Sequence, residues 1–323
     1  MKSRMTRLRA VAGAGALVLA ACTGGSTDGA EHAPNDAPGT IVNLCEPFAD
    51  MPTGRIAYTR YAGDGSAGIY LMDPDGSNRT CLVDTPGEDT HPAWSSNGTV
   101  IAFTSDLDGD ADVYTIRADG TGLRRLTNAA GDEFQPVWAQ DGREIAYSIE
   151  GIHDVATSFS IHVIGPDGTG DRTVLDSSGE YEVTELQDWS PDGRIMVFRA
   201  EGPGGPGFFA MSPTGDRIRR MHPFVGDFGA GAVFSPDGER LVFQADLDGG
   251  CIYTMDADGT GLERITTGCA DAFMITWSPD GQRIAFAGGP HGPADAYVMN
   301  ADGTNRILID DGADAAFLAW QPV

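Results

Sequence analysis

Short apolar stretches alternate with tight polar turns from about residue 51 to the end of the chain. In one clear example, the turn Ser278-Pro279-Asp280-Gly281 precedes the apolar residues 283–286, and a second apolar stretch at 296–299 leads into the turn at 300–303. Proline fixes φ at the first corner of such a turn and glycine supplies the positive φ at its exit, so each tetrad reverses the chain. Because the apolar positions show no long 3.6-residue periodicity, the pattern predicts strands rather than helices.

The strands and turns form a repeat in which each unit is marked by one aromatic residue. These six residues stand 43 to 51 positions apart: Trp94, Trp138, Trp189, Phe234, Trp277 and Trp320. A second turn recurs six times, at residues 73–76, 117–120, 165–168, 212–215, 256–259 and 300–303. A period in the low forties is typical of four-stranded propeller blades. The repeat therefore predicts an all-β, six-bladed β-propeller over residues 51–323.

The two ends of the repeat region complement each other. The first repeat begins at its second strand, residues 54–58, and the chain ends with an extra first strand at residues 316–322. We expect the C-terminal strand to complete the N-terminal blade, because a ring closed in this way leaves no sheet edge between the first and last blades.

The repeat also carries a family resemblance. The phrase Trp-Ser-Pro-Asp-Gly at 277–281, followed by an apolar triplet, a tyrosine-containing strand and Ala-Asp-Gly-Thr at 301–304, resembles the WD-related repeat of TolB-like β-propellers. Three turns read Ser-Pro-Asp-Gly, at 190–193, 235–238 and 278–281. Departures from the pattern occur at 95–98, 139–142 and Phe234. The resemblance implies a six-bladed TolB-like ring, and propellers present their ends as binding surfaces.

The N-terminal residues have the pattern of a secretory signal. A basic start precedes an apolar run from Leu8 to Ala21, which at about 14 residues is shorter than the roughly 20 that a transmembrane helix needs. Leu19-Ala20-Ala21-Cys22 resembles the bacterial lipobox, and that resemblance implies cleavage before Cys22 and diacylation of its thiol. The alternative is an ordinary signal peptide with an incidental cysteine. We expect a signal peptide at 1–21, a flexible tether and lead-in at 22–50, and a lipid anchor on the extracytoplasmic face of the cell membrane.

The other four cysteines form an even set in an oxidising compartment, which favours disulfides. They are Cys45, Cys81, Cys251 and Cys269, and three pairings exist. We favour Cys251 with Cys269, because the two flank the turn at 258–261 at nearly equal distances. This leaves Cys45 with Cys81, which would pin the lead-in to the first blade.

The charge of the chain excludes one class of partner. Asp and Glu number 47 against 21 Lys and Arg, for a net charge of −26, and the only lysine is Lys2. Nucleic-acid binding depends on cationic side chains that displace counterions from phosphates, so we expect no nucleic-acid partner. An acidic surface instead favours solubility, calcium or a basic protein partner. We expect a monomer.

Acidic residues recur at one position of the repeat and predict a charged rim. The residues six positions before each repeat aromatic are Glu88, Asp132, Val183, Phe228, Asp271 and Asp314. If the aromatic strands are innermost, as the family resemblance implies, these residues ring one mouth of the channel. The rim is either a site for a cation or a basic segment, or a solvated acidic edge. His91, three residues before Trp94, either faces the channel or is a hydrogen-bonded turn residue.

A second acidic cluster alternates along one hairpin loop. It consists of Asp106, Asp108, Asp110 and Asp112. Alternating oxygen ligands suit Ca²⁺, but the glycine stands fourth and not sixth as in an EF-hand loop. The two interpretations are a Ca²⁺ site and a polar turn between two strands.

The sequence favours binding over catalysis. It contains no G-x-S-x-G elbow, and its six histidines are scattered without metal-ligand spacing. The competing hypothesis is a propeller lyase or hydrolase in which His91, Glu88 and Asp132 converge on one metal in the funnel. We favour a non-catalytic cell-envelope lipoprotein whose ring is a scaffold for a protein or ligand.

Overall fold

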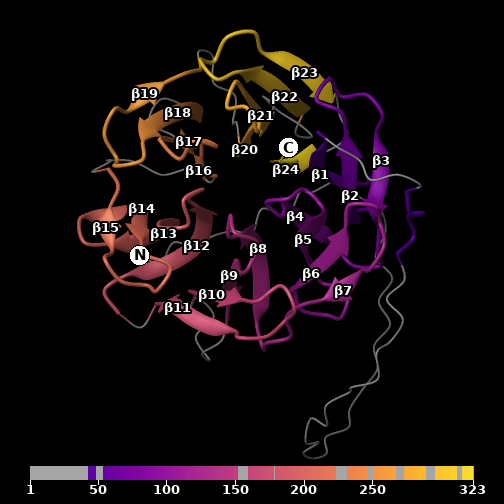
Figure 1. Ribbon diagram of the computed structural model, residues 1–323, viewed down its shortest axis with the longest axis horizontal. Helices are drawn as coiled ribbons and strands as arrows, with labels where there is room; N and C mark the ends of the chain where they lie inside the picture. Colours follow the sequence, from indigo (N-terminus) through magenta and orange to yellow (C-terminus); the bar gives the residue numbers. More distant parts are fainter. Residues whose placement is uncertain are drawn as a thin grey trace, which may run out of the picture. The chain divides into compact units, whose positions relative to one another are not determined.

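The computed structural model describes residues 43–48, 54–151, 159–177, 179–222, 231–245, 250–266, 273–288, 295–310 and 315–322. Its regular elements in these ranges are all β-strands, and they form six four-stranded antiparallel sheets arranged as a ring (Figure 1). The predicted fold, an all-β six-bladed propeller, is confirmed. Within the described ranges, the chain forms no helix long and apolar enough to cross a membrane.

Each blade consists of an innermost strand followed by three strands toward the outside of the ring. Blade one contains β24 (Ala315–Trp320), β1 (Ile56–Tyr61), β2 (Ala67–Met72) and β3 (Thr80–Val83). Blade two contains β4 (Asp89–Trp94), β5 (Val100–Ser105), β6 (Asp112–Arg117) and β7 (Arg124–Arg125). Blade three contains β8 (Asp132–Trp138), β9 (Ile145–Glu150), β10 (Phe159–Ile164) and β11 (Arg172–Asp176).

The other three blades follow the same order. Blade four contains β12 (Glu182–Trp189), β13 (Met196–Gly202), β14 (Gly205–Met211) and β15 (Arg219–Arg220). Blade five contains β16 (Val233–Phe234), β17 (Arg240–Ala245), β18 (Cys251–Asp256) and β19 (Glu263–Arg264). Blade six contains β20 (Phe273–Trp277), β21 (Arg283–Gly288), β22 (Asp295–Asn300) and β23 (Ile307–Asp310).

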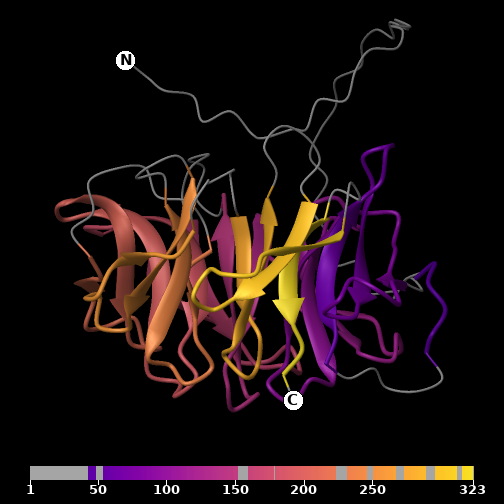
Figure 2. The same ribbon diagram turned by 90° about the horizontal axis from the view of Figure 1, so that it is seen from above.

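The ring closes as the sequence predicts. The C-terminal strand β24 pairs antiparallel with β1, with Ile56 opposite Trp320 and Arg60 opposite Ala315. The last strand of the chain therefore completes the first blade, and Figure 2 shows it beside β1 with the chain end at one face of the ring.

The repeat tryptophans join neighbouring blades. The indole N–H of Trp94 donates to the carbonyl of Ala319 in the preceding blade at 3.1 Å, and that of Trp138 donates to the carbonyl of Ala93 at 3.2 Å. Trp277 makes the same bond to the carbonyl of Val233. Each acceptor is the residue just before the repeat aromatic of the previous blade. The tryptophan at the end of an innermost strand thus satisfies a main-chain acceptor next to the channel.

The hydrophobic core lies between successive sheets. One cluster packs Phe208 of blade four against Leu241 and Phe243 of blade five, and another packs Tyr58 of blade one against Ala285 of blade six. These side chains are almost fully buried, and each contributes roughly 1.5–3 kcal/mol when it is a large apolar group. Because every blade covers its neighbours, the ring positions six innermost strands rigidly around one channel.

The glycine of the second turn is required where two blades meet. At Gly259 φ is +93°, and a Cβ there would lie 1.7 Å from the carbonyl oxygen of Met221 in the preceding blade. At Gly303 the corresponding distance to the carbonyl oxygen of Ile265 is also 1.7 Å. The recurring glycine therefore serves both the turn conformation and the close approach of blades.

The lead-in segment 43–48 packs against the outer edge of the propeller. Cys45 is disulfide-bonded to Cys81 of β3, with the two Cα atoms 5.6 Å apart. The N–H of Leu44 donates to the carbonyl of Asp84 at 2.8 Å. Cys251 is also disulfide-bonded, but Cys269 lies outside the described residues, so their pairing stays a prediction. The signal segment 1–21 and Cys22 also lie outside the described residues.

Candidate functional site

Four innermost strands carry the same irregularity close to the channel. In each, two residues lie opposite one residue of the next strand, which is a β-bulge. The first residue of each pair has a left-handed backbone and stands three positions before the repeat aromatic. These residues are His91 (φ 54°), Gln135 (φ 53°), Met274 (φ 56°) and Phe317 (φ 48°).

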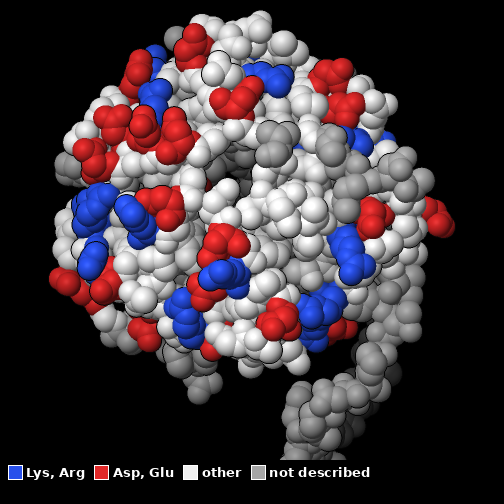
Figure 3. All heavy atoms as spheres, in the orientation of Figure 1, with Lys and Arg blue, Asp and Glu red and all other residues white. Residues whose placement is uncertain are grey.

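The four left-handed residues lie in the middle of innermost strands, which surround the centre of the ring (Figure 1). Each of the four keeps some exposed surface. Figure 3 shows one face of the ring, with a hollow at its centre and acidic and basic side chains interspersed around it. We call these four residues the channel ring. A left-handed conformation costs a non-glycine residue about 1–3 kcal/mol, and such strain clusters at functional sites.

The imidazole of His91 packs among aromatic rings. Its centroid lies 3.6 Å from that of Phe317 and 6.5 Å from that of Phe134. Burial lowers the pKa of His91 to about 3, so the imidazole is neutral at physiological pH. Its Nδ1 lies 3.0 Å from the hydroxyl of Thr90. His91 is therefore a neutral ring with a polar partner, and its exposure to the channel stays a prediction.

The fourth blade contributes polar groups to the same region. The Oε1 of Gln187 accepts hydrogen bonds from the main-chain N–H groups of Gly231 at 2.8 Å and Ala232 at 3.1 Å. The Oδ2 of Asp188 accepts a hydrogen bond from the N–H of Phe234 at 2.7 Å. Burial raises the pKa of Asp188 to about 7, even though the main-chain N–H groups that it binds oppose this change. Two side chains of β12 thus hold the innermost strand of blade five.

The two described members of the acidic rim lie at the starts of neighbouring innermost strands. Glu88 and Asp132 are both exposed, and the Oδ1 of Asp132 accepts a hydrogen bond from the N–H of Ala111 at 3.3 Å. The N–H of Glu88 donates to the Oδ1 of Asp106 at 2.6 Å. The hairpin loop of blade two therefore contacts the rim. Asp271 and Asp314 lie outside the described residues.

The carboxylates of that hairpin loop have separate partners. Asp108 accepts hydrogen bonds from the Tyr114 hydroxyl at 3.0 Å and from the Arg125 guanidinium at 3.1 Å. Asp112 is fully buried and pairs with Arg125 at 2.6 Å, and burial, with Glu133 beside it, raises its pKa. Among the described residues, no group of three or more His, Cys, Asp or Glu side chains is arranged to hold a metal ion. Arg125 and Tyr114 thus occupy the carboxylates of Asp108 and Asp112, and Ca²⁺ binding at this loop stays a prediction.

Sequence reasoning found one member of the channel ring and missed three. His91 was singled out by its position three residues before Trp94, and the same offset from the other aromatics identifies Gln135, Met274 and Phe317. Asp188 was also missed, although a carboxylate directly before a repeat aromatic is unusual among the six repeats. Together these groups offer a neutral imidazole, amides, a thioether and a phenyl ring, which suit binding through hydrogen bonds and apolar contact.

Comparison with known proteins identifies the family. Residues 49–232 match the family model of the TolB beta propeller domain, which is more than half of the chain. The chain belongs to this family. Over 110 residues it is 33% identical to the Tol-Pal system protein TolB of Anaeromyxobacter sp. strain K, an alignment that covers 33% of this chain and 24% of the relative.

Two further likenesses agree with the TolB propeller assignment. An uncharacterized protein of Agrobacterium fabrum, Atu1656, is 27% identical over 139 residues, which are 41% of this chain and 44% of that protein. The crystal structure of TolB from Acinetobacter baumannii superimposes with a TM-score of 0.70 at 20% identity, covering 85% of this chain and 68% of that one. The chain thus aligns with less than half the length of these sequence relatives, and the solved structure supports the fold.

Proposed function

We propose that the chain is a non-catalytic lipoprotein of the cell envelope, anchored through Cys22, whose TolB-like propeller binds a protein or ligand segment in its central channel. The observation that carries this proposal is which residue types stand at the four positions of the channel ring. Asn78 and Asn305, which lie outside the channel, are also left-handed, and asparagine tolerates that conformation. The channel ring instead uses histidine, glutamine, methionine and phenylalanine, which have no such tolerance except in part for histidine. The strained backbone therefore supports selection of these side chains for what they contact in the channel.

The chemistry of the channel ring supports an uncharged or apolar binding segment. The Oε1 of Gln135 is buried and has no hydrogen-bond partner among the described residues. Leaving a buried acceptor unpaired costs about 1–3 kcal/mol, which a bound donor would recover. Met274 and Phe317 add apolar surface, and the Phe317 ring lies beside the neutral His91. The name of the matched relatives, Tol-Pal system protein TolB, supports a role alongside other envelope proteins.

The test compares variants that change the channel without changing its backbone. In the channel variant, His91, Gln135, Met274 and Phe317 are all replaced by asparagine, which keeps the left-handed conformation. Arg217→Asn is the matched control, because Arg217 is left-handed (φ 57°) but lies in an exposed turn. Lipoprotein purified from native envelope in detergent is analysed for co-purifying proteins. We expect a partner that binds the wild type and the Arg217→Asn control but not the channel variant; retention by all three would contradict channel binding.

A rim variant separates the channel from its acidic mouth. Glu88, Asp132, Asp271 and Asp314 are changed to the corresponding amides, which removes charge and keeps size. If the rim is a socket for a basic segment, this variant loses the partner that the wild type binds at low salt. Low salt is used because at 0.1 M salt the attraction between exposed charges more than about 10 Å apart is largely screened. If the rim is only solvated, the variant retains the partner.

The lipid anchor has its own test. Mass spectrometry of the mature N-terminal peptide is expected to show a diacylglycerol thioether on Cys22, and Cys22→Ser is expected to move the protein from the membrane fraction to the soluble fraction. An unmodified Cys22, or a mature chain that begins elsewhere, would contradict the lipoprotein assignment and leave the propeller proposal intact.

A further inference from the structure

Arginine side chains join several neighbouring blades at their outer turns. The arginine four residues after the turn glycine reaches the main-chain carbonyls of the next blade's turn. Arg124 donates to the carbonyls of Pro166 and Asp167. Arg172 donates to the carbonyl of Pro213 at 3.1 Å, and Arg219 donates to those of Asp258 at 3.0 Å and Ala257 at 3.1 Å. Guanidinium groups thus satisfy the exposed carbonyls of the turn.

Two other junctions lack this arginine. Between blades one and two the lead-in supplies the donor, because the N–H of Phe48 bonds the carbonyl of Asp119 at 2.7 Å. Between blades five and six the arginine position is Glu263, which pairs with Arg240 of its own blade at 3.7 Å. The contact of Phe48 shows that a group from outside the six sheets can occupy this kind of junction.

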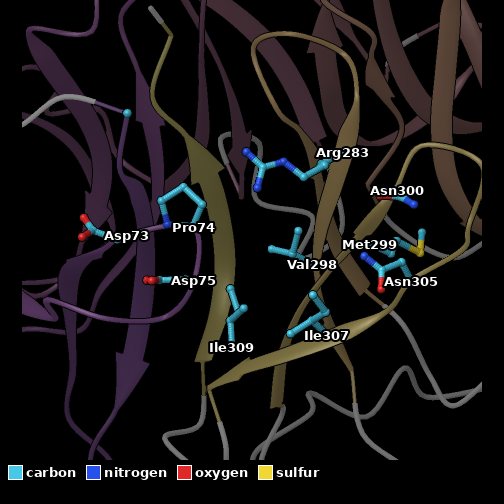
Figure 4. Close-up of a pocket in the computed structure, with 11 residues that line it drawn as sticks. Asp73, Pro74, Asp75, Arg283, Val298, Met299, Asn300, Asn305, Ile307 and Ile309 are labelled. Carbon is cyan, nitrogen blue, oxygen red and sulfur yellow. The ribbon is translucent and has the colours of Figure 1, made fainter.

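The junction between blades six and one contains a cavity at this position. The residue four places after Gly303 is Ile307, whose side chain is 53% exposed. A cavity of about 620 Å³ lies here, and Figure 4 shows Pro74 and Asp75 of blade one on one side and Ile307 and Val298 of blade six on the other. No described residue donates a hydrogen bond to the carbonyls of Pro74 and Asp75, which correspond to those that Arg124 binds.

Among the described residues, the two arginines beside this cavity have other partners. Every arginine beyond Arg9 lies among the described residues, and the tether from 23 to 42 contains neither lysine nor arginine. Arg79 lies at the same junction but is committed to the carbonyls of Ile309 and Gly76 and to Asp310. Arg283, which also lines the cavity, lies over the ring of Trp320 at 5.0 Å. No described arginine therefore donates to the carbonyls of Pro74 and Asp75, which leaves them open to a guanidinium from another molecule.

We propose that the cavity between blades six and one is a docking site for an arginine side chain of a partner protein. The methylene groups of the arginine pack on Ile307, and its guanidinium donates to the carbonyls of Pro74 and Asp75, next to the Asp75 carboxylate. Asp73 is already paired with Arg55 at 2.9 Å. The Oδ1 of Asp75 accepts hydrogen bonds from Ser77, so its Oδ2 is the oxygen that would face the incoming charge. The net charge of −26 favours approach of a basic segment. This site is separate from the channel and does not depend on the function proposed for it.

The test uses a peptide taken from the chain itself. Residues 121–128, acetylated and amidated, present the arginine that fills the equivalent position between blades two and three. The control peptide carries citrulline at both arginines, which keeps the shape and removes the charge. By calorimetry on the full-length lipoprotein in detergent, we expect the arginine peptide to bind at least about tenfold more tightly than the citrulline peptide. Equal affinities, or no binding of the arginine peptide at its solubility limit, would overturn the proposal.

Two protein variants locate the binding. Ile307→Arg places the chain's own guanidinium in the cavity, so it is expected to abolish peptide binding and to raise the unfolding midpoint by about 2 °C or more. Leu308→Arg adds the same charge at the neighbouring exposed residue, which lies on the other side of the strand, and is expected to leave both quantities unchanged. Unaltered peptide binding by Ile307→Arg would place the arginine elsewhere and overturn the assignment. Whether the channel variant keeps or loses its partner has no bearing on peptide binding at this cavity, so the two proposals can fail independently.

Discussion

The N–H of Phe234 donates to the Oδ2 of Asp188 at 2.7 Å, and this bond joins the innermost strands of blades four and five. At three other junctions an indole N–H donates across to the preceding blade, but phenylalanine has no such donor. Here the carboxylate of Asp188 in blade four instead accepts a hydrogen bond from the main chain of blade five. Its burial next to the channel raises its pKa to about 7, which makes the stability of this junction sensitive to pH.

Asp188→Asn is expected to flatten the dependence of stability on pH. The folded-state pKa of Asp188 lies above the ordinary value of 3.8, so the native state binds more protons than the unfolded state between about pH 4 and pH 7. The contribution of Asp188 is therefore fully present below about pH 4 and is lost as the pH rises through 7. Urea unfolding from pH 4 to 8 measures it, and the wild type should lose stability relative to the variant across this window. Parallel curves would contradict the assigned pKa.

An internal control for this experiment is Asp237, whose pKa shifts in the opposite direction. The hydroxyl of Ser235 donates to its Oδ1 at 2.6 Å and lowers the pKa of Asp237. Its contribution is present above the unfolded-state pKa and is lost as the pH falls. Asp237→Asn should therefore lower stability at neutral pH, and its difference from the wild type should shrink as the pH falls below about 4, opposite to Asp188→Asn.

Trp138→Phe is expected to destabilise the propeller by about 1 kcal/mol or more. The substitution removes the indole N–H that bonds the carbonyl of Ala93 and leaves that acceptor unpaired. Trp189 is the matched control, because its indole N–H is buried and has no hydrogen-bond partner among the described residues. Trp189→Phe therefore loses ring volume without losing a hydrogen bond. Urea denaturation of the two variants should show the larger loss for Trp138→Phe, and equal losses would mean that the inter-blade bond contributes nothing.

The repeat was predictable because its signals are local. Proline and glycine fix the backbone conformation of each turn. The extra strand that ends at Trp320 predicts that the ring closes by pairing with the strand that begins at Ile56. The sequence predicted the Cys45–Cys81 disulfide because these two cysteines remain once Cys251 is paired with Cys269. These features need only residue types and spacing.

The channel ring and the junction contacts were not predictable in the same way. The bulge at Phe317 exists because it and Leu318 both lie opposite Tyr58, and that register is a property of the paired strands. The acceptors of Arg124 and Arg219 are main-chain carbonyls, which leave no signature in side-chain identity. The partners of the acidic cluster from Asp106 to Asp112 were not predictable for a related reason, since Arg125 lies outside the loop.

Removal of the Cys45–Cys81 disulfide is expected to release the lead-in from the first blade. The bond closes a loop with a sequence separation of 36, for which the chain-entropy model gives about 3–4 kcal/mol. Cys45→Ala with Cys81→Ala should lower the urea midpoint and increase hydrogen exchange at the N–H groups of Leu44 and Phe48. The N–H groups of blade four should keep their protection, and a ring-wide increase in exchange would show that the lead-in stabilises the whole propeller.

Gly259→Ala is expected to disrupt the junction between blades four and five. A Cβ at this position would lie 1.7 Å from the carbonyl oxygen of Met221, so the blades must separate to accept it, at a cost of about 3 kcal/mol or more. Gly65 provides the matched control, because its φ of +91° is nearly the same as the +93° of Gly259 but a Cβ there meets nothing within 4 Å. Gly65→Ala should cost only the left-handed penalty, about 1–2 kcal/mol. Thermal and urea unfolding of both variants separate the cost of the left-handed backbone from the cost of the steric overlap with Met221. If the two variants lose the same stability, the recurring glycine serves the turn alone and the close approach of blades has no energetic consequence.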